Sequence, residues 1–195
     1  MNRKTNNPKH QNQIRIIGGS CRGRKISFPS ADGLRPTPDM VRERLFNWLG
    51  QDLTGWNVLD LFAGSGALGL EAASRNAKQV ILVEQNRQVA KNLQGHAQIF
   101  RLAQAEVYCG DAFAYLKQAG TSFDLVFLDP PFAWQAWKEL FGILQRRLKN
   151  GGKIYIEAGT LPDLPTNFVL LKAGKSGMSR FLLLEKHPLS PNQDE

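Results

Sequence analysis

The chain has 195 residues, of which 42% are hydrophobic, and its formal net charge is +8. This length predicts a single domain, and the apolar content is enough for a substantial core. Cys21 and Cys109 form no CxxC motif and the three histidines are scattered, so we expect no metal and free thiols in a reducing cytoplasm. No apolar leader or long apolar span is present, which argues against secretion and against a membrane protein.

Most of the excess positive charge lies in the first 50 residues, which hold ten basic and three acidic side chains. Residues 1–13 are expected to be disordered. Residues 14–17 and 24–28 are predicted to form two strands of a hairpin, joined by a Gly-rich loop. Concentrated positive charge attracts polyphosphates. The basic side chains of this ribbon and of the segment after it are Arg15, Arg22, Arg24, Lys25, Arg35 and Arg42.

A helix is predicted from about residue 38 to residue 49. Thr37 is the expected N-cap, Pro38 suits the first helical position, and Gly50 ends the helix. Apolar residues at helical spacing predict that the helix packs on the domain that follows. Residues 1–50 are therefore interpreted as a basic extension (hairpin about 14–28, helix about 38–49), residues 51–186 as the catalytic domain, and residues 187–195 as a tail.

A glycine-rich loop follows the next predicted strand, residues 58–62. Gly64, Gly66 and Gly69 have GxGxxG spacing and open a helix to about residue 75, which is typical of nucleotide-cofactor sites. The strand at 80–83 ends in Glu84, which is placed to accept hydrogen bonds from ribose hydroxyls. The strand at 105–109 is followed by Asp111.

The cofactor class can be narrowed by charge. Asp60 lies in the strand before the loop, and its carboxylate suits a cationic ligand such as S-adenosylmethionine but would repel a pyrophosphate. A nicotinamide-dependent oxidoreductase is a weaker alternative for this reason and because no hydride-transfer pair is evident. The predicted cofactor-binding residues are Asp60, Ala63, Gly64, Gly66, Glu84, Asp111 and Ala112.

The most informative segment is residues 124–132, an apolar run that ends in Asp129-Pro130-Pro131-Phe132. The run predicts a buried strand, and the two prolines end it because neither can donate to a sheet. A flat base could stack on Phe132 while its exocyclic amine donates to Asp129 and to the Pro130 carbonyl. The predicted catalytic residues are Asp129, Pro130, Pro131 and Phe132.

The remaining segments predict the fold class. Helices are expected at 85–97, 113–119 and 134–149, a strand at 153–157, and an antiparallel pair at 168–172 and 179–185. The fold class is therefore α/β: a doubly wound, Rossmann-like sheet that is mostly parallel, with an antiparallel C-terminal strand pair and an N-terminal β-hairpin.

Between residues 57 and 132 the chain resembles class I S-adenosylmethionine-dependent methyltransferases. Residues 14–186 as a whole resemble the bacterial 16S ribosomal RNA guanine-N2 methyltransferases. The segments that carry the narrower resemblance are RIIGG (15–19), RGRK (22–25), LRPT (34–37), RE (42–43), LFNWL (45–49), FAGSGALGLEA (62–72) and DPPF (129–132).

This resemblance implies methyl transfer to N2 of one guanine, guanine 966, in 16S ribosomal RNA. It also implies that the partner is RNA already assembled with ribosomal proteins in a partial small subunit, and RNA is then the expected ligand of the six basic residues named above. We expect a monomer. An adenine-N6 or protein-glutamine methyltransferase and a non-catalytic RNA-binding module remain alternatives; the basic ribbon argues against the protein substrate and the intact acidic positions argue against the non-catalytic module.

Overall fold

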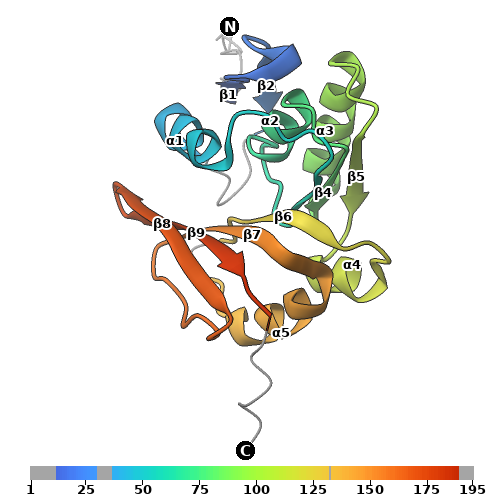
Figure 1. Cartoon of the computed structure of the whole chain (residues 1–195). Coiled ribbons are helices and arrows are strands. Elements are labelled where there is room, and N and C mark those ends of the chain that lie inside the picture. The colour runs from blue at the N-terminus through green and yellow to red at the C-terminus, as the bar shows by residue number, and fades with distance from the viewer. Residues whose placement is uncertain (1–11, 30–36, 132, 189–195) are drawn as a thin grey trace, which may run out of the picture.

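A seven-stranded sheet forms the centre of the molecule (Figure 1). The structure, a computed structural model, describes residues 12–29, 37–131 and 133–188. The strands of the sheet are β3 (Asn57–Asp60), β4 (Gln79–Glu84), β5 (Ala105–Cys109), β6 (Phe123–Leu128), β7 (Leu148–Ala158), β8 (Phe168–Ser176) and β9 (Ser179–Lys186). Their spatial order is β5-β4-β3-β6-β7-β9-β8. Strands β3 to β7 are parallel and β8 and β9 are antiparallel, which confirms the predicted fold class.

The direction in which successive strands are added to the sheet reverses between β3 and β6. From β3 it adds β4 and β5 on one side, and it then returns to place β6 on the other side of β3. In open parallel sheets, ligands bind beyond the carboxyl ends of the strands at such a switch point. A site is therefore expected among the residues that follow β3 and β6.

Helices cover both faces of the sheet (Figure 1). One face packs against α1 (Asp39–Leu49), α2 (Gly69–Ser74) and α3 (Arg87–Ile99), and the other against α4 (Ala112–Gln118) and α5 (Trp137–Arg147). Successive residues of β3 serve both cores, since Val58 lies in the first and Leu59 in the second. Coverage on both sides explains why the strands read as continuous apolar runs.

The N-terminal hairpin pairs β1 (Asn12–Arg15) with β2 (Lys25–Phe28), and its connection contains one turn of 3₁₀ helix, η1 (Gly19–Cys21). The expected disorder of residues 1–13 is wrong for residues 12 and 13, because Asn12 and Gln13 pair with Phe28 and Ser27 across the hairpin. Residues 1–11 and 189–195 lie outside the described residues. Pairing with a strand anchored by buried Ile26 outweighs the polar composition of this segment.

Helix α1 packs into the same core as the sheet, as predicted, but Thr37 is not its cap. The helix starts after Pro38, with no side-chain cap hydrogen bond. The buried Thr37 instead directs its hydroxyl to Asp129, with 3.4 Å between Oγ1 and Oδ2. The Thr37 hydroxyl is thus used for a tertiary hydrogen bond and not for the helix cap that its position favours.

The segment after β6 differs from its prediction at both ends. A helix was expected over residues 134–149, whereas α5 spans Trp137–Arg147 and Leu148 already belongs to β7. Trp134 and Trp137 are only partly buried against the core that contains Phe141. Within the described residues, no helix is long and apolar enough to cross a membrane.

Candidate functional site

The loop after β3 is shaped by glycine and by Asp60. Gly66 has φ +79°, a left-handed conformation that favours glycine, and its N–H donates to the Ala63 carbonyl at 2.7 Å. The Gly69 N–H donates to Asp60 Oδ2 at 2.8 Å. A Cβ atom on Gly69 would lie only 2.8 Å from Leu82 Cδ2 and 3.0 Å from that carboxylate oxygen. Glycine at position 69 thus allows Asp60 to hold the start of α2 against the strand.

Glu84 connects the end of β4 to this loop. Its Oε2 accepts the Gly64 N–H at 2.9 Å, and its Oε1 accepts the Asn86 N–H at 2.7 Å. These bonds fix both carboxylate oxygens in direction. Each oxygen retains a lone pair for a further donor, as the ribose hydroxyls of a nucleoside cofactor would provide.

Asp111 and Ala112 lie at the end of the neighbouring strand β5. Asp111 is exposed and caps α4, with its Oδ1 accepting the Ala114 N–H at 2.9 Å. The Gly110 N–H donates to the Glu84 carbonyl at 3.0 Å, which joins the ends of β4 and β5. Residues predicted from three separate motifs therefore meet at one edge of the sheet.

Asp129 follows β6 on the other side of the switch point. Burial raises the pKa of its carboxyl well above the usual range, the negative charges of Glu157 and Asp60 raise it further, and the Thr37 hydrogen bond lowers it. Pro130 is buried, and the exposed Pro131 accepts the Trp134 N–H at 2.8 Å. Phe132, the fourth residue of the motif, lies outside the described residues.

Sequence reasoning missed Glu157, an acidic neighbour whose charge raises the pKa of Asp129. Glu157 is 5% exposed, and its Oε2 accepts the Tyr155 hydroxyl at 2.9 Å. Burial raises its pKa, while hydrogen bonds from Tyr155, Ser179 and Thr37 lower it. Its position near the end of a strand is the signal that identified Glu84. It was overlooked because that strand was predicted only as a core element.

Asp60, Asp129 and Glu157 come from the ends of three adjacent strands. The pairing of Asp60 with Phe127 and of Leu128 with Ile156, together with the two-residue alternation of strands, places the three carboxyl groups on one face. Burial raises the pKa of Asp60 to about 7, helped by Glu84 and opposed by the N–H groups of Gly69 and Phe62. Asp129 is thus repelled by both of the other carboxyl groups, and the oxygens of such groups can accept hydrogen bonds from N–H donors.

The exposed basic residues of the hairpin are Arg15, Arg22, Arg24 and Lys25. Arg24 also holds the hairpin on α3, since its guanidinium donates to the Ile99 carbonyl at 3.2 Å and lies 4.9 Å from the centre of the Phe100 ring. Arg15 lies 3.8 Å from the carboxylate of Asp39. Arg35 is outside the described residues.

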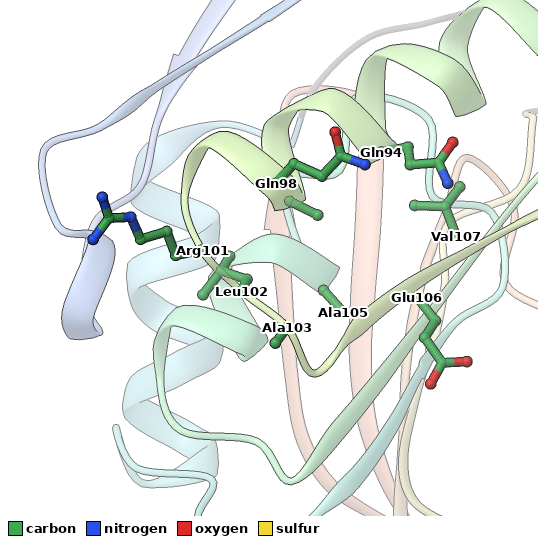
Figure 2. Close-up of a pocket in the computed structure, with 9 residues that line it drawn as sticks. Gln94, Gln98, Arg101, Leu102, Ala103, Ala105, Glu106 and Val107 are labelled. Carbon is green, nitrogen blue, oxygen red and sulfur yellow. The ribbon is translucent and has the colours of Figure 1, made fainter.

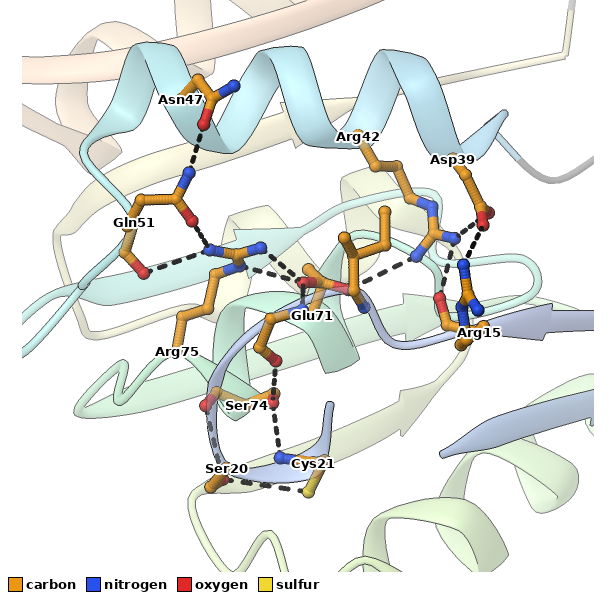
Figure 3. Close-up of polar contacts among 12 residues, drawn as sticks. Arg15, Ser20, Cys21, Asp39, Arg42, Asn47, Gln51, Glu71, Ser74 and Arg75 are labelled. Atoms are coloured by element: carbon orange, nitrogen blue, oxygen red, sulfur yellow. Dashed lines mark hydrogen bonds and ion pairs between the residues drawn. The ribbon is translucent and has the colours of Figure 1, made fainter. Parts of the chain in front are cut away.

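Arg42 was predicted to bind RNA, and that prediction is wrong because its side chain is fully buried. Figure 3 shows the polar network that contains it. Arg42 pairs with Glu71 at 3.4 Å and with Asp39 at 2.5 Å. The Glu71 carboxylate also pairs with Arg75 at 2.8 Å.

The same Glu71 carboxylate accepts the backbone N–H groups of Ile17 and Gly18 at 2.8 and 2.7 Å. Ser74 adds two more bonds to the hairpin, accepting the Cys21 N–H at 2.9 Å and donating to the Gly18 carbonyl at 2.6 Å. The basic hairpin is thus fixed to α2, the helix that begins at the glycine-rich loop.

A hollow of about 620 Å³ lies elsewhere, between the end of α3 and β5 (Figure 2). Gln94, Gln98, Arg101 and Glu106 are among its lining side chains. Ala105 at the start of β5 also lines it, so it lies toward the amino end of that strand and away from Asp111. It is not part of the candidate site.

Comparison with known proteins gives consistent matches over most of the chain. The family described as conserved hypothetical protein 95 matches residues 14–185. Ribosomal RNA small subunit methyltransferase D of Escherichia coli K12 is 40% identical over 186 residues, 92% of this chain and 94% of the relative. The Haemophilus influenzae protein of the same name is 39% identical over 94% of this chain and 99% of its own length.

The fold has solved counterparts. The structure described as putative methyltransferase yhhF from Escherichia coli superposes with a TM-score of 0.82 at 40% identity, covering 90% of this chain and 99% of that one. A putative methylase from Haemophilus influenzae, HI0767, gives a TM-score of 0.76 at 37% identity, covering 91% and 100%.

Proposed function

Since this chain belongs to the family described as conserved hypothetical protein 95, we propose that it transfers a methyl group from S-adenosylmethionine to N2 of a guanine in small-subunit ribosomal RNA, at position 966 of the 16S molecule. The observation that carries the proposal is that Asp129 and Glu84 both lie close enough to Asp60 to interact with it electrostatically at the switch point of the sheet. An acceptor for an exocyclic amine thus stands beside a cofactor loop, on a chain whose relatives are named as ribosomal RNA methyltransferases.

The residues at the ends of β3, β4 and β5 fit S-adenosylmethionine. Glu84 has lone pairs left for two ribose hydroxyls, and Asp111 places a further carboxylate at the same edge. A side chain at position 69 would clash with Leu82 and Asp60, so glycine there keeps the backbone close to the strand. The buried Asp60 supplies the negative charge that a cationic ligand requires. Ala63, Gly64, Gly66 and Ala112 complete the proposed cofactor contacts.

The bound cofactor would supply a methyl group on a positively charged sulfur, which departs as a neutral thioether. Guanine N2 is a poor nucleophile because its lone pair is delocalised into the ring. We assign to Asp129 and the Pro130 carbonyl the role of accepting the N2–H bonds, which favours a pyramidal nitrogen with its lone pair directed at the methyl carbon. Pro131 fixes the turn, and Phe132 provides a stacking face for a base flipped out of the RNA.

The proton lost from N2 needs no strong base, since the methylated nitrogen is acidic until that proton leaves. Asp129 can take the proton directly and pass it to solvent. Positioning and electrostatics then account for the rate, and no covalent enzyme intermediate is required.

The exposed Arg15, Arg22, Arg24 and Lys25 support RNA as the partner, because they form a basic surface fixed to the cofactor helix by Glu71. We propose the same role for Arg35. We further propose that the protein acts as a monomer and that its substrate is a partly assembled small subunit. In this proposal, residues 1–50 form a basic extension on a catalytic domain of residues 51–186.

The decisive experiment supplies the protein with methyl-labelled S-adenosylmethionine and either unmodified small subunits, their deproteinised RNA, or DNA. Nuclease digestion and mass spectrometry then identify the product. We expect N2-methylguanosine in small subunits and none in DNA. N6-methyladenosine would establish the main alternative, an adenine methyltransferase, and a complete lack of transfer to all three would refute the proposed activity.

A further inference from the structure

We propose that the end of the β8–β9 hairpin, residues 172–181, is a second RNA-contacting surface. It lies on the side of the active site away from β4 and β5. The inference rests on the proposed function and adds to it a binding element distinct from the N-terminal ribbon. Its contact residues are Lys172, Lys175, Met178 and Arg180, all exposed.

Strand register places this hairpin end beside the catalytic motif. Ala158, the last residue of β7, pairs with Arg180 of β9, and β7 runs parallel to β6, which ends before Asp129. The turn between β8 and β9 therefore lies at the carboxyl edge of the sheet. Ser179 adds a direct link, since its hydroxyl is hydrogen-bonded to Glu157. Figure 1 shows the hairpin at the far edge of the sheet from β5.

The charge arrangement of the hairpin end calls for an anionic partner. Lys175 and Arg180 stand directly opposite each other in the antiparallel register, and like charges in that relation destabilise a sheet. Residues 172–181 contain three basic and no acidic side chains. Within the described residues, neither Lys175 nor Arg180 belongs to an ion pair.

The other end of β9, where it pairs with β7, shows the contrast. Lys153 of β7 stands opposite Glu185 of β9, and the two side chains form an ion pair at 2.9 Å. Opposite charges therefore face each other at the end of β9 far from the active site, and like charges face each other at the end near it. Phosphate groups of a bound RNA would relieve the repulsion between Lys175 and Arg180.

The turn adds an apolar contact. Gly177 has φ +57°, and Met178 beside it is 75% exposed. The Met178 side chain is flexible and polarisable and lies in sequence between Lys175 and Arg180. Contact with an unstacked base would be more favourable for it than exposure to water. Cations that hold the backbone and a methionine that meets a base together indicate single-stranded or looped RNA.

The test compares the double variant Lys175→Gln/Arg180→Gln with the matched double variant Lys78→Gln/Lys117→Gln. The control removes two exposed charges that precede β4 and end α4, at the opposite edge of the sheet. Binding to unmodified small subunits and to their deproteinised RNA is measured by fluorescence anisotropy over a range of salt concentrations. Methyl transfer and binding of S-adenosylhomocysteine are measured in parallel.

We expect the hairpin variant to bind both probes about tenfold more weakly. The slope of the logarithm of its binding constant against the logarithm of salt concentration should become shallower by about 1.5, the value for two lost phosphate contacts. The control should bind like the unaltered protein, and so should Lys175→Arg/Arg180→Lys, which keeps both charges. S-adenosylhomocysteine binding should be unchanged in all variants.

Equal binding by the hairpin variant and the control would overturn the inference, whatever the methyl transfer assay shows. Loss of binding to assembled subunits but not to deproteinised RNA would assign the hairpin to a ribosomal protein and would also overturn it. Normal binding by the unaltered protein without methyl transfer would instead contradict the proposed function, while a binding defect in the hairpin variant would still support the RNA contact.

Discussion

At the scale of single residues, Asp129 is the side chain on which the proposed chemistry depends. We expect Asp129→Ala to lower the turnover number about 10²- to 10³-fold, the usual effect of removing one positioned polar group from a transition state. Cofactor affinity should change little, because the proposed role of Asp129 is to contact the target base and not the cofactor. Single-turnover methyl transfer measures the first quantity and calorimetry the second. Asp163→Asn, at an exposed position, is the control, and full activity in Asp129→Ala would refute the mechanism.

Glu157 should act on the reaction through its charge. The pKa of Asp129 is raised first by burial and then by Glu157, and an ionised Asp129 is the better acceptor for N2–H. Activity should therefore increase with pH as Asp129 loses its proton. Glu157→Gln removes a neighbouring negative charge, lowers the pKa of Asp129, and should shift this rise to lower pH. A pH profile of single-turnover rates tests the shift, and an unchanged profile would exclude the coupling.

The buried Asp60 predicts a pH-dependent preference between two cofactor forms. Its pKa is about 7, and a nearby cation favours the ionised carboxylate, so binding S-adenosylmethionine below pH 7 must expel a proton. The affinity of the protein for S-adenosylmethionine should then decrease by up to about tenfold per pH unit below 7. S-adenosylhomocysteine has a neutral sulfur and should show a weaker dependence. Parallel titrations of the two ligands from pH 5 to pH 8 would contradict the role of Asp60 if their slopes were equal.

At the scale of elements, the docking of the hairpin on α2 depends on Glu71. Its carboxylate is fully buried and pairs with Arg42 and Arg75 as well as with two backbone N–H groups. Glu71→Gln should lower the free energy of unfolding by about 3–5 kcal/mol, because two buried guanidinium groups lose their counter-charge. Urea denaturation measures the loss. Glu43→Gln, on the exposed face of α1, should change stability by less than about 0.5 kcal/mol.

At the scale of the whole molecule, the uneven charge should control substrate binding. Replacing Arg15, Arg22 and Arg24 by Ala should abolish RNA methylation and leave S-adenosylhomocysteine binding intact, because these side chains lie on the hairpin and not at the cofactor edge. Arg24 also contacts Phe100, so the single variant Arg22→Ala is needed to separate RNA binding from docking. Methyl transfer to small subunits tests the loss of activity, and filter binding over a salt series measures the loss of affinity. Normal methylation by the triple variant would show that the ribbon is structural.

The sequence alone determined which predicted strands carry the acidic residues of the candidate site. One predicted apolar run contains Asp60 and two others end in Glu84 and Asp129. Separated by helical segments, they predict a parallel sheet, and parallel strands bring their carboxyl ends to one edge. This inference needs only local periodicity and the handedness of crossover connections. The glycine spacing predicted the tight loop after β3 for the same reason, since the backbone conformation at Gly66 is a local property.

Only the tertiary structure decided which polar side chains belong to the site and which to the core. Arg42 and Arg22 are both arginines in a basic segment, yet Arg42 is buried against Glu71 and Arg22 is exposed. Thr37 satisfies every local rule for a helix cap but serves Asp129 instead. Glu157 and the hairpin end approach the site through pairing between strands distant in sequence. Burial and pairing of this kind depend on contacts across the fold, and no local pattern records them.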